Sequence, residues 1–485
     1  MTKVSDPIQF IRGGLRALAA LRLAAPFALL LGLFLSMAAV DPAAAIPSFA
    51  RQTGQTCSAC HTAFPQLTPF GRRFKLGGYT LEGGDSTLPP LAMMVQSTYT
   101  NYARALTAPS GTYAPPSPNG GFDNNNNYVD GSQQISLFYG GKIFGNLGAF
   151  VQTTFSNDYG RTIGLDQTDV RYADSVKIDG FGGFGAFDVL YGLTVNNNPT
   201  VQDVWNTTPV WSSPFITSNF ALNPVASTLI ESFGPSQQLG AGAYVFINDM
   251  VYLEVAGYGS LSQRAQTSLG ACCGVTISGI APYWRAAIEQ NWGDHSWEVG
   301  TYGMSTNVTP NASYGFGTDN YTDIAFDSQY QWISDMHAVT VRANYILEKQ
   351  ILNASSNPNF QNPATNPTDY LRSLKIGAEY VYDHTYSATA TYFQITGSPD
   401  ALLYMNNVNT SPNSSGWIFD VAYLPFSHGP PKDFAWPWFN TRIGVSYTLF
   451  TRFDGGTTNI DPVGCPGCRN ASNNNTLLVY AFTAF

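Results

Sequence analysis

The chain has 485 residues, of which 11% are charged and 14% are aromatic, and its net charge at pH 7 is −9. Ordinary soluble domains carry roughly 25% charged residues, so most of the polarity of this chain comes from uncharged side chains. The negative net charge makes nucleic acid a poor partner, and no apolar run after the first 45 residues is long enough for a membrane-spanning helix. A long chain that is poor in charge, rich in aromatic residues and without a membrane-spanning helix is expected to be a large β-sheet protein or a β-barrel.

Residues 1–45 have the pattern of a secretory signal peptide. Basic residues precede an apolar run over residues 23–40, and three alanines end the segment at Ala45. This order is typical of an export signal, and we expect cleavage after Ala45. An uncleaved membrane anchor is the alternative, although small residues close the apolar run. Export would bring the remaining chain into an oxidising compartment.

Residues 57–61 read Cys-Ser-Ala-Cys-His, the spacing that attaches a c-type haem covalently. The thiols of Cys57 and Cys60 would bond to the two vinyl groups of one porphyrin, and His61 would be the proximal iron ligand. A disulfide or a structural zinc site is the alternative, but zinc would need a second pair of ligands, and none follows nearby in the sequence. The motif therefore predicts one haem c, attached in the periplasm.

Residues 46–90 form the predicted haem-binding unit, made mostly of helix and loop. About 45 residues are too few to enclose a haem unaided, so the rest of the chain must supply further walls. Cations are concentrated here in a chain poor in charge, and Arg51 and Arg72 are candidate partners of the haem propionates. Pairing of these arginines with acidic residues on an inner barrel wall is an equal alternative. The expected apolar wall consists of Phe49, Phe64, Leu67, Phe70 and Phe74.

Met93 and Met94 are the candidate second ligands of the iron. A methionine ligand raises the reduction potential of a haem, and strand alternation points one of two adjacent residues into a barrel lumen. An inward histidine or an open coordination position is the alternative. The histidines at 295, 337 and 384 fall at predicted turns, where they are expected to be solvated.

Residues 91–485 alternate with period two, which predicts an antiparallel transmembrane β-barrel of sixteen strands. In residues 338–349, for example, Val339 and Val341 share one face while Thr340 and Arg342 share the other. An apolar face toward lipid and a polar face toward the lumen produce this alternation. The expected strands are 92–102, 134–144, 147–157, 168–178, 188–197, 238–248, 251–261, 280–292, 296–307, 322–333, 338–349, 370–382, 386–396, 416–425, 440–452 and 476–485.

The connections alternate between short turns and long loops, as in outer-membrane barrels with periplasmic turns and outside loops. This assignment puts both termini in the periplasm, and the segment Ser427–Trp438 is the one overlong turn. A soluble β-sandwich or propeller is the alternative, but it would not need an apolar face on every strand. The last strand ends at Phe485 and resembles the insertion signal of bacterial outer-membrane proteins.

Four further cysteines lie in predicted outside loops, at Cys272, Cys273, Cys465 and Cys468. Disulfides across the loops are the expected state in an oxidising location, with metal binding as the alternative. No histidine follows Cys468, so this pair does not predict a second haem.

These parts together resemble the fused monohaem cytochrome-porins, the iron(II)-oxidising outer-membrane cytochromes of acidophilic iron-oxidising bacteria. The residues that carry the resemblance are Pro47, Phe49, Arg51, Thr53, Gly54, Cys57, Cys60, His61, Pro65, Leu67, Gly71, Phe74, Leu76, Gly78 and Tyr79. The low charge suits acid, because fewer carboxylates lose their stabilising interactions on protonation.

The resemblance implies an oxidoreductase that takes electrons from extracellular Fe(II) at its haem. It also implies that a periplasmic c-type cytochrome or blue-copper protein accepts them. A cytochrome-porin for another extracellular donor, such as a sulfur compound or manganese, is one alternative. A passive porin with a haem-bearing plug is the other, and no nucleophile with its base or phosphate-binding loop stands out in the sequence.

Overall fold

The computed structural model describes residues 46–485 except 85–86, 106–125, 157–161, 180–184, 200, 202, 208–215, 234–236, 270–275, 311–314, 360–363, 434–435, 459 and 461–468. The predicted signal peptide lies outside the described residues. The four loop cysteines, Cys272, Cys273, Cys465 and Cys468, also lie outside them, so their predicted pairing stays a prediction.

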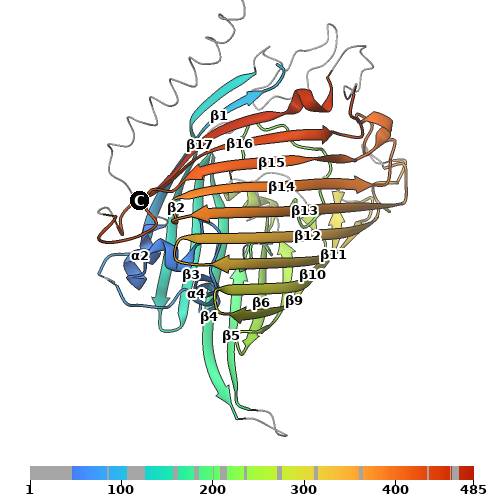
Figure 1. Ribbon diagram of the computed structural model, residues 1–485. Helices are drawn as coiled ribbons and strands as arrows, with labels where there is room; N and C mark the ends of the chain where they lie inside the picture. The colour runs from blue at the N-terminus through green and yellow to red at the C-terminus, as the bar shows by residue number, and fades with distance from the viewer. Residues whose placement is uncertain are drawn as a thin grey trace, which may run out of the picture. The chain divides into compact units, whose positions relative to one another are not determined.

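Sixteen long antiparallel strands close into a barrel in the part of the chain that the structure describes (Figure 1). Each strand pairs with its neighbours in sequence, and β1 pairs with both β2 and β17, which closes the ring. The strands are β1 (Leu91–Tyr102), β2 (Asn127–Phe144), β3 (Leu147–Ser156), β4 (Thr162–Ile178), β5 (Phe187–Asn196), β6 (Gln238–Ile247), β7 (Val251–Ser260), β9 (Ala281–Trp292), β10 (His295–Thr309), β11 (Asp319–Ile333), β12 (His337–Ile351), β13 (Thr368–Tyr382), β14 (Tyr386–Gly397), β15 (Ser414–Tyr423), β16 (Asn440–Arg452) and β17 (Thr476–Ala484). A two-residue strand, β8 (Thr276–Ile277), pairs with the end of β10.

The barrel prediction is confirmed, and each expected strand has a counterpart. The largest differences in length are at β2 and β4, which begin well before the predicted residues 134 and 168. Both extensions belong to the end of the barrel that carries the long loops.

The two faces of the strands differ in polarity, as the alternation predicts. In β12, Thr340, Arg342 and Glu348 are buried inside the barrel, whereas Val341 and Leu347 are exposed on its outer face. A closed ladder satisfies every backbone group between strands, and an apolar outer face suits hydrocarbon. The protein is therefore an outer-membrane barrel. Among the described residues, no helix is long and apolar enough to cross a membrane.

Short turns occupy one end of the barrel, as expected. They are residues 145–146, 248–250, 293–294, 334–336 and 383–385. The connection between β4 and β5, residues 179–186, is somewhat longer, and residues 424–439, between β15 and β16, are much longer; we call residues 424–439 the overlong turn.

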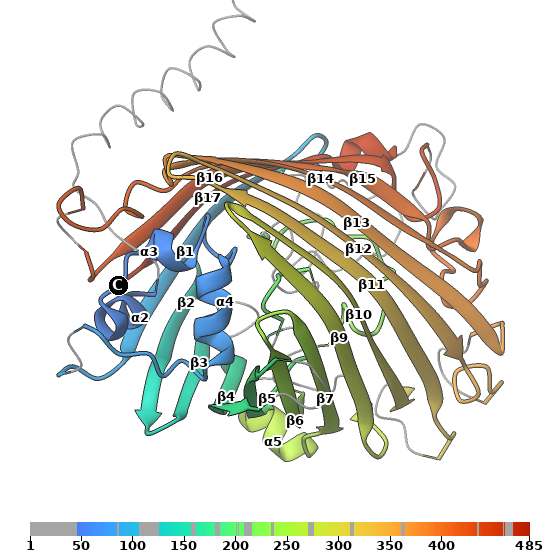
Figure 2. The same cartoon turned by 60° about the horizontal axis from the view of Figure 1, so that its bottom comes forward.

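Three short helices form the N-terminal unit and lie at the short-turn end (Figure 2). They are α2 (Pro47–Thr53), α3 (Cys57–Cys60) and α4 (Pro69–Leu76). Proline begins α2 and α4, where its missing N–H costs no helical hydrogen bond. Gly54 ends α2 with φ of 69°, a conformation that glycine adopts without strain. The remaining helices lie in loops: α5 (Gln263–Ser268), η3 (Val408–Thr410) and η4 (Ala471–Asn474).

The connection from β5 to β6, residues 197–237, is called the lumen loop here, because its described residues fold into the barrel. Trp205 is 1% exposed, and its Nε1 donates to Glu289 Oε2 on β9 at 2.5 Å. The backbone N–H of Leu229 donates to Glu348 Oε2 on β12 at 2.5 Å. An outside loop was expected at 198–236, but its apolar side chains and backbone donors find partners on the inner wall instead.

Candidate functional site

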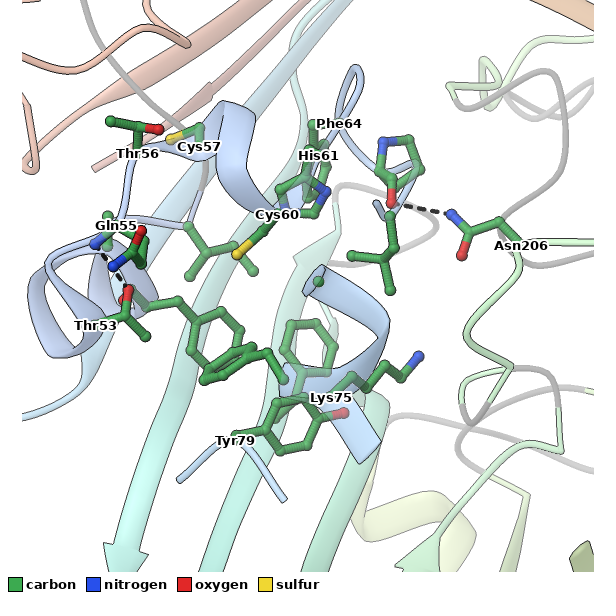
Figure 3. A pocket seen from close by; sticks show the side chains of 18 of the residues that line it. Thr53, Gln55, Thr56, Cys57, Cys60, His61, Phe64, Lys75, Tyr79 and Asn206 are labelled. Carbon is green, nitrogen blue, oxygen red and sulfur yellow. Dashed lines mark hydrogen bonds between the residues drawn. The ribbon is translucent and has the colours of Figure 1, made fainter. Parts of the chain in front are cut away.

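A cavity lies between the N-terminal helices, β3 and the lumen loop, and it contains the Cys-x-x-Cys-His motif (Figure 3). It encloses about 910 Å³ of empty space, which includes space open to solvent. Its apolar lining includes Ile46, Phe49, Phe64, Leu67, Phe74 and Phe150. Four of these residues were expected from the sequence. Phe70, the fifth expected wall residue, is exposed on α4 and is not among the described lining residues.

The motif forms a single helical turn, and the side chains of Cys57, Cys60 and His61 line the cavity. Cys57 and Cys60 begin and end α3, and the backbone N–H of His61 donates to Cys57 O at 2.8 Å. Helix α4 approaches this turn closely, because a Cβ added to Gly71 would lie 2.2 Å from Cys60 O. Thr68 ties the two helices together by donating its hydroxyl to Ala59 O at 2.6 Å and accepting from Gly71 N.

Burial sets the protonation of the two titratable groups at the motif. Desolvation lowers the pKa of His61 to about 4, although interactions with the backbone of Gln66 and Pro65 oppose the shift. The imidazole is therefore mostly neutral above about pH 4, and the neutral ring is the form that binds metal. Burial also raises the pKa of the Cys60 thiol to about 11. His61 Nδ1 is buried without a hydrogen-bond partner.

The structure places Arg72 against the inner barrel wall, the second of the two arrangements expected for it. Its Nη2 lies 3.0 Å from Glu289 Oε1 and 2.7 Å from Ser296 Oγ, and its Nη1 lies 2.7 Å from Gln331 Oε1. Arg51 donates to Leu91 O at 2.5 Å, with its guanidinium 5.2 Å from the centre of the Trp438 ring. Neither arginine is among the described residues that line the cavity.

Lys75 is the cation that the described cavity lining does contain. Its Nζ donates to Val201 O at 2.5 Å and to Asp203 O at 2.9 Å, both in the lumen loop. Desolvation lowers its pKa to about 8, and repulsion from Arg171 acts in the same direction. Lys75 therefore stays charged in acid and joins α4 to the lumen loop.

The two candidate methionine ligands point in opposite directions from β1. Met93 is 39% exposed on the outer face, whereas Met94 is 3% exposed and packs with Tyr79 and Phe150. Neither methionine is among the described lining residues, although Tyr79 and Phe150 are. Met94 is thus the member of the pair that lies on the cavity side of the strand.

The turn histidines lie at the short-turn rim, as expected, but their rings are partly buried instead of fully solvated. His295 stacks on Trp292 with ring centres 5.4 Å apart, and its Nδ1 lies 2.7 Å from the hydroxyl of Tyr330. His337 lies 2.7 Å from the Tyr380 hydroxyl in the same way. Within the described ranges, no group of three or more His, Cys, Asp or Glu side chains is placed to hold a metal ion.

The barrel and the lumen loop hold the segment that follows the motif, residues 61–68, which we call the ligand loop. Arg442 Nη1 on β16 donates to Phe64 O at 2.5 Å, and Asn206 Nδ2 in the lumen loop donates to Pro65 O at 3.0 Å. Arg342 on β12 donates to Gln66 Oε1. Sequence reasoning missed these anchors. Arginines at inward positions of strands are a signal that could have found two of them.

The overlong turn covers the motif from the other side. The N–H of Ser58 donates to Ser427 O at 3.1 Å. Gly429 has φ of 72°, and a Cβ added there would lie 2.4 Å from Thr56 Cγ2. The overlong turn therefore packs on the Cys-x-x-Cys-His motif.

An ion pair at the centre of a charged cluster holds the lumen loop to the barrel wall. Arg285 on β9 lies 2.5 Å from Asp327 and 3.3 Å from Glu298, and 3.6 Å from Asp203 of the loop. Its guanidinium also lies 5.0 Å from the centre of the Trp205 ring. Buried charges in such a cluster are tolerated because each has partners of opposite sign.

No family model and no curated protein matches the chain. Among solved structures, OmpF of Salmonella typhi in complex with daunomycin is 13% identical with a TM-score of 0.44, and the match covers 81% of this chain and 97% of that one. The anion-selective porin from Comamonas acidovorans is 10% identical with a TM-score of 0.42, covering 81% and 98%. OmpT of Vibrio cholerae is 7% identical with a TM-score of 0.38, covering 81% and 97%.

Proposed function

We propose that the protein is an outer-membrane electron conduit that carries one haem c on Cys57 and Cys60. It takes electrons from extracellular Fe(II) and passes them to a periplasmic c-type cytochrome or blue-copper protein. The observation that carries this proposal is that both cysteines and His61 of the motif line one cavity with apolar walls. When bound, the haem supplies a one-electron redox centre.

The residues of the cavity fit a c-type haem. The two thiols stand one helical turn apart, and the buried imidazole of His61 is mostly neutral above about pH 4 and lacks a hydrogen-bond partner at Nδ1. The apolar side chains of α2, α4 and β3 would exclude water from the porphyrin faces, which favours a high reduction potential. Thr53, Gln55, Thr56 and Lys75 supply polar groups in the lining that could receive the propionates.

The lumen favours a conduit over an open channel. The described part of the lumen loop fills part of the barrel interior, with one ion pair to Arg285 of β9 and hydrogen bonds to Glu289 of β9 and Asp327 of β11. An electron can cross packed protein, whereas a hydrated solute needs open space. The reaction leaves Fe(III) outside and one electron on the periplasmic carrier.

An optical spectrum of the purified full-length protein, with and without Fe(II) in acid, tests this function. Reduced haem bands that appear on addition of Fe(II) support it. A haem that stays ferric under excess Fe(II) removes Fe(II) as the donor. The same spectrum recorded with sulfur compounds and with manganese then tests other donors. Reduction of the haem by one of them would support a conduit for that donor.

A passive porin with a haem-bearing plug is the second candidate. Lys375 and Gly377 on the inner face of β13 remain partly exposed and line a small lumen cavity with Thr391. Polar side chains around open space are typical of a porin lumen. Single-channel recording separates the two candidates, because large conductance with the plug in place supports the porin and a closed lumen supports the conduit.

A further inference from the structure

A second cavity lies between α2, the short-turn end of β2 and residues 82–90, and we call it the basic cavity. It contains about 660 Å³ of empty space, which includes space open to solvent. Its lining includes two cations, Arg51 and Lys142, one carboxylate, Glu82, and the hydroxyl of Ser48. Helix α2 lies beside β2 (Figure 2) and contributes different residues to this cavity and to the one that contains the Cys-x-x-Cys-His motif.

Arg51 is the cation on the α2 wall of the basic cavity. Its Nη2 donates to Leu91 O at 2.5 Å, and its guanidinium lies 5.2 Å from the centre of the Trp438 ring. Partial burial lowers the pKa of Arg51, and no carboxylate among the described residues opposes this shift. A guanidinium has five N–H donors, so Arg51 has donors left for an anion.

The opposite wall supplies the second cation. Lys142 Nζ lies 2.5 Å from Glu82 Oε2, and the lysine is 26% exposed while the glutamate is 49% exposed. The backbone N–H of Lys142 donates to Gln52 Oε1 at 2.8 Å, which holds the end of β2 against α2. Because Glu82 is the more exposed partner, an incoming anion can replace it on Lys142 while Glu82 turns to solvent.

The hydroxyl of Ser48 lacks a partner. Ser48 is 1% exposed, and its Oγ is buried with no hydrogen-bond partner in the part of the chain that the structure describes. A buried hydroxyl without a partner destabilises the folded state, and an anion that accepted from it would remove this cost. The lining of the basic cavity thus includes three kinds of donor: a guanidinium, an ammonium and a hydroxyl.

The arrangement of these donors favours one class of anion. The two oxygens of a carboxylate lie in one plane, whereas a phosphate group carries four oxygens in a tetrahedron. A tetrahedral anion therefore suits donors that approach from different walls. Arginine binds phosphate with a fork of N–H groups, and lysine binds it as a point charge.

We propose that the basic cavity binds a phosphate group, held by Arg51 and Lys142 with the Ser48 hydroxyl beside them. This inference depends neither on a haem nor on Fe(II). The phosphate can come from the inorganic ion or from the headgroup of a phospholipid, since basic pockets at a membrane surface bind headgroups. Leu88 and Ile143 also line the cavity, each 47% exposed, and they give an acyl chain an apolar exit.

Binding to the full-length protein in a neutral detergent tests the proposal. Isothermal titration calorimetry with inorganic phosphate alone measures the soluble source. Native mass spectrometry after transfer from phosphatidylglycerol nanodiscs into detergent counts the phospholipid that the protein retains. Calorimetric binding supports the site with the free ion as ligand. Retained lipid without calorimetric binding supports it with the headgroup as ligand.

Variants of the two cavity charges should act in opposite directions. Lys142→Gln should weaken binding of the ligand by about tenfold, because a hydrogen bond to a charged group is lost. Glu82→Gln should strengthen binding, because it frees Lys142 from its ion pair. Arg73→Gln is the matched control. Arg73 is also a partly exposed cation of the N-terminal unit, but it pairs with Asp188 and Asp249 and is not among the described lining residues.

Three results would overturn the proposal. The first is a wild-type protein that binds neither inorganic phosphate nor phosphatidylglycerol. The second is an equal loss of binding in Lys142→Gln and Arg73→Gln, which would show attraction by overall charge instead of a site. The third is weaker binding in Glu82→Gln, a variant that removes no cation and therefore decides the matter if Lys142→Gln does not fold.

Discussion

Replacing Arg72 with leucine should release the N-terminal unit from the barrel wall. Its guanidinium is 2% exposed and pairs with Glu289, which is 3% exposed, at 3.0 Å. Breaking a buried pair by removing one partner costs about 3–5 kcal/mol, because the other charge stays buried. Glu289 would still accept from Trp205 Nε1 at 2.5 Å and from Asn291 Nδ2 at 2.9 Å. We therefore expect the lower end, about 3 kcal/mol.

Amide hydrogen exchange of residues 46–90, followed by mass spectrometry, measures this loss as opening of the unit. A loss of about 3 kcal/mol corresponds to roughly a hundredfold faster exchange. Arg73→Leu is the control on the same helix. Arg73 pairs with Asp249 and, at 3.4 Å, with Asp188 while 42% exposed, and such surface pairs contribute about 0–1 kcal/mol each.

A double variant makes the test sharper. Adding Glu289→Gln to Arg72→Leu removes the unpaired charge, so part of the protection should return. If residues 46–90 exchange equally fast in Arg72→Leu and Arg73→Leu, the buried ion pair of Arg72 with Glu289 does not hold the N-terminal unit to the barrel. Protection that falls further in the double variant would show that Glu289 has a different role.

Three further predictions concern the site. The double variant Cys57→Ser/Cys60→Ser should lose all covalent haem, and a haem-stained band on a denaturing gel would contradict the attachment. Burial lowers the pKa of Lys75 to about 8, so from about pH 8 to its ordinary 10.5 the unfolded chain holds the proton more tightly and the free energy of opening rises with pH. Amide hydrogen exchange, measured from about pH 8 to 10.5, should show this rise in the free energy of opening for the wild type. If the same rise persists in Lys75→Met, another titrating group causes it. Gly429→Ala should cost about 1 kcal/mol or more, because its φ is 72° and a Cβ would meet Thr56. Faster proteolysis of the overlong turn would report this loss, and cleavage at the wild-type rate would contradict the close contact.

The strands could be predicted because their signal is local. Each strand shows its own alternation, as Val341 and Arg342 do in β12, and an apolar face on every strand is typical of a closed membrane barrel. The lumen loop could not be predicted in this way. Trp205, Leu229 and Ile230 show no period, and the acidic partners that draw them inward lie on strands far along the chain.

The motif residues of the site could be recognised from their spacing, but their surroundings could not. The hydrogen-bond acceptors of Arg72 depend on the register of β9, β10 and β11. The sequence alone left a haem propionate and an acidic residue on the barrel wall as equal candidates for its partner. The anchor at Asn206 depends on a loop whose path was expected to be outside. Alternation did predict that one of Met93 and Met94 points inward, and the structure identifies Met94.

The overlong turn has a consequence for biogenesis. Cys57 is 7% exposed, and its helix is covered by residues 424–439, which belong to the last part of the chain to be synthesised. Under the proposed function, an enzyme that joins porphyrin to these thiols would need them uncovered. The cofactor would then join the exported chain before β15 and β16 fold and the barrel inserts.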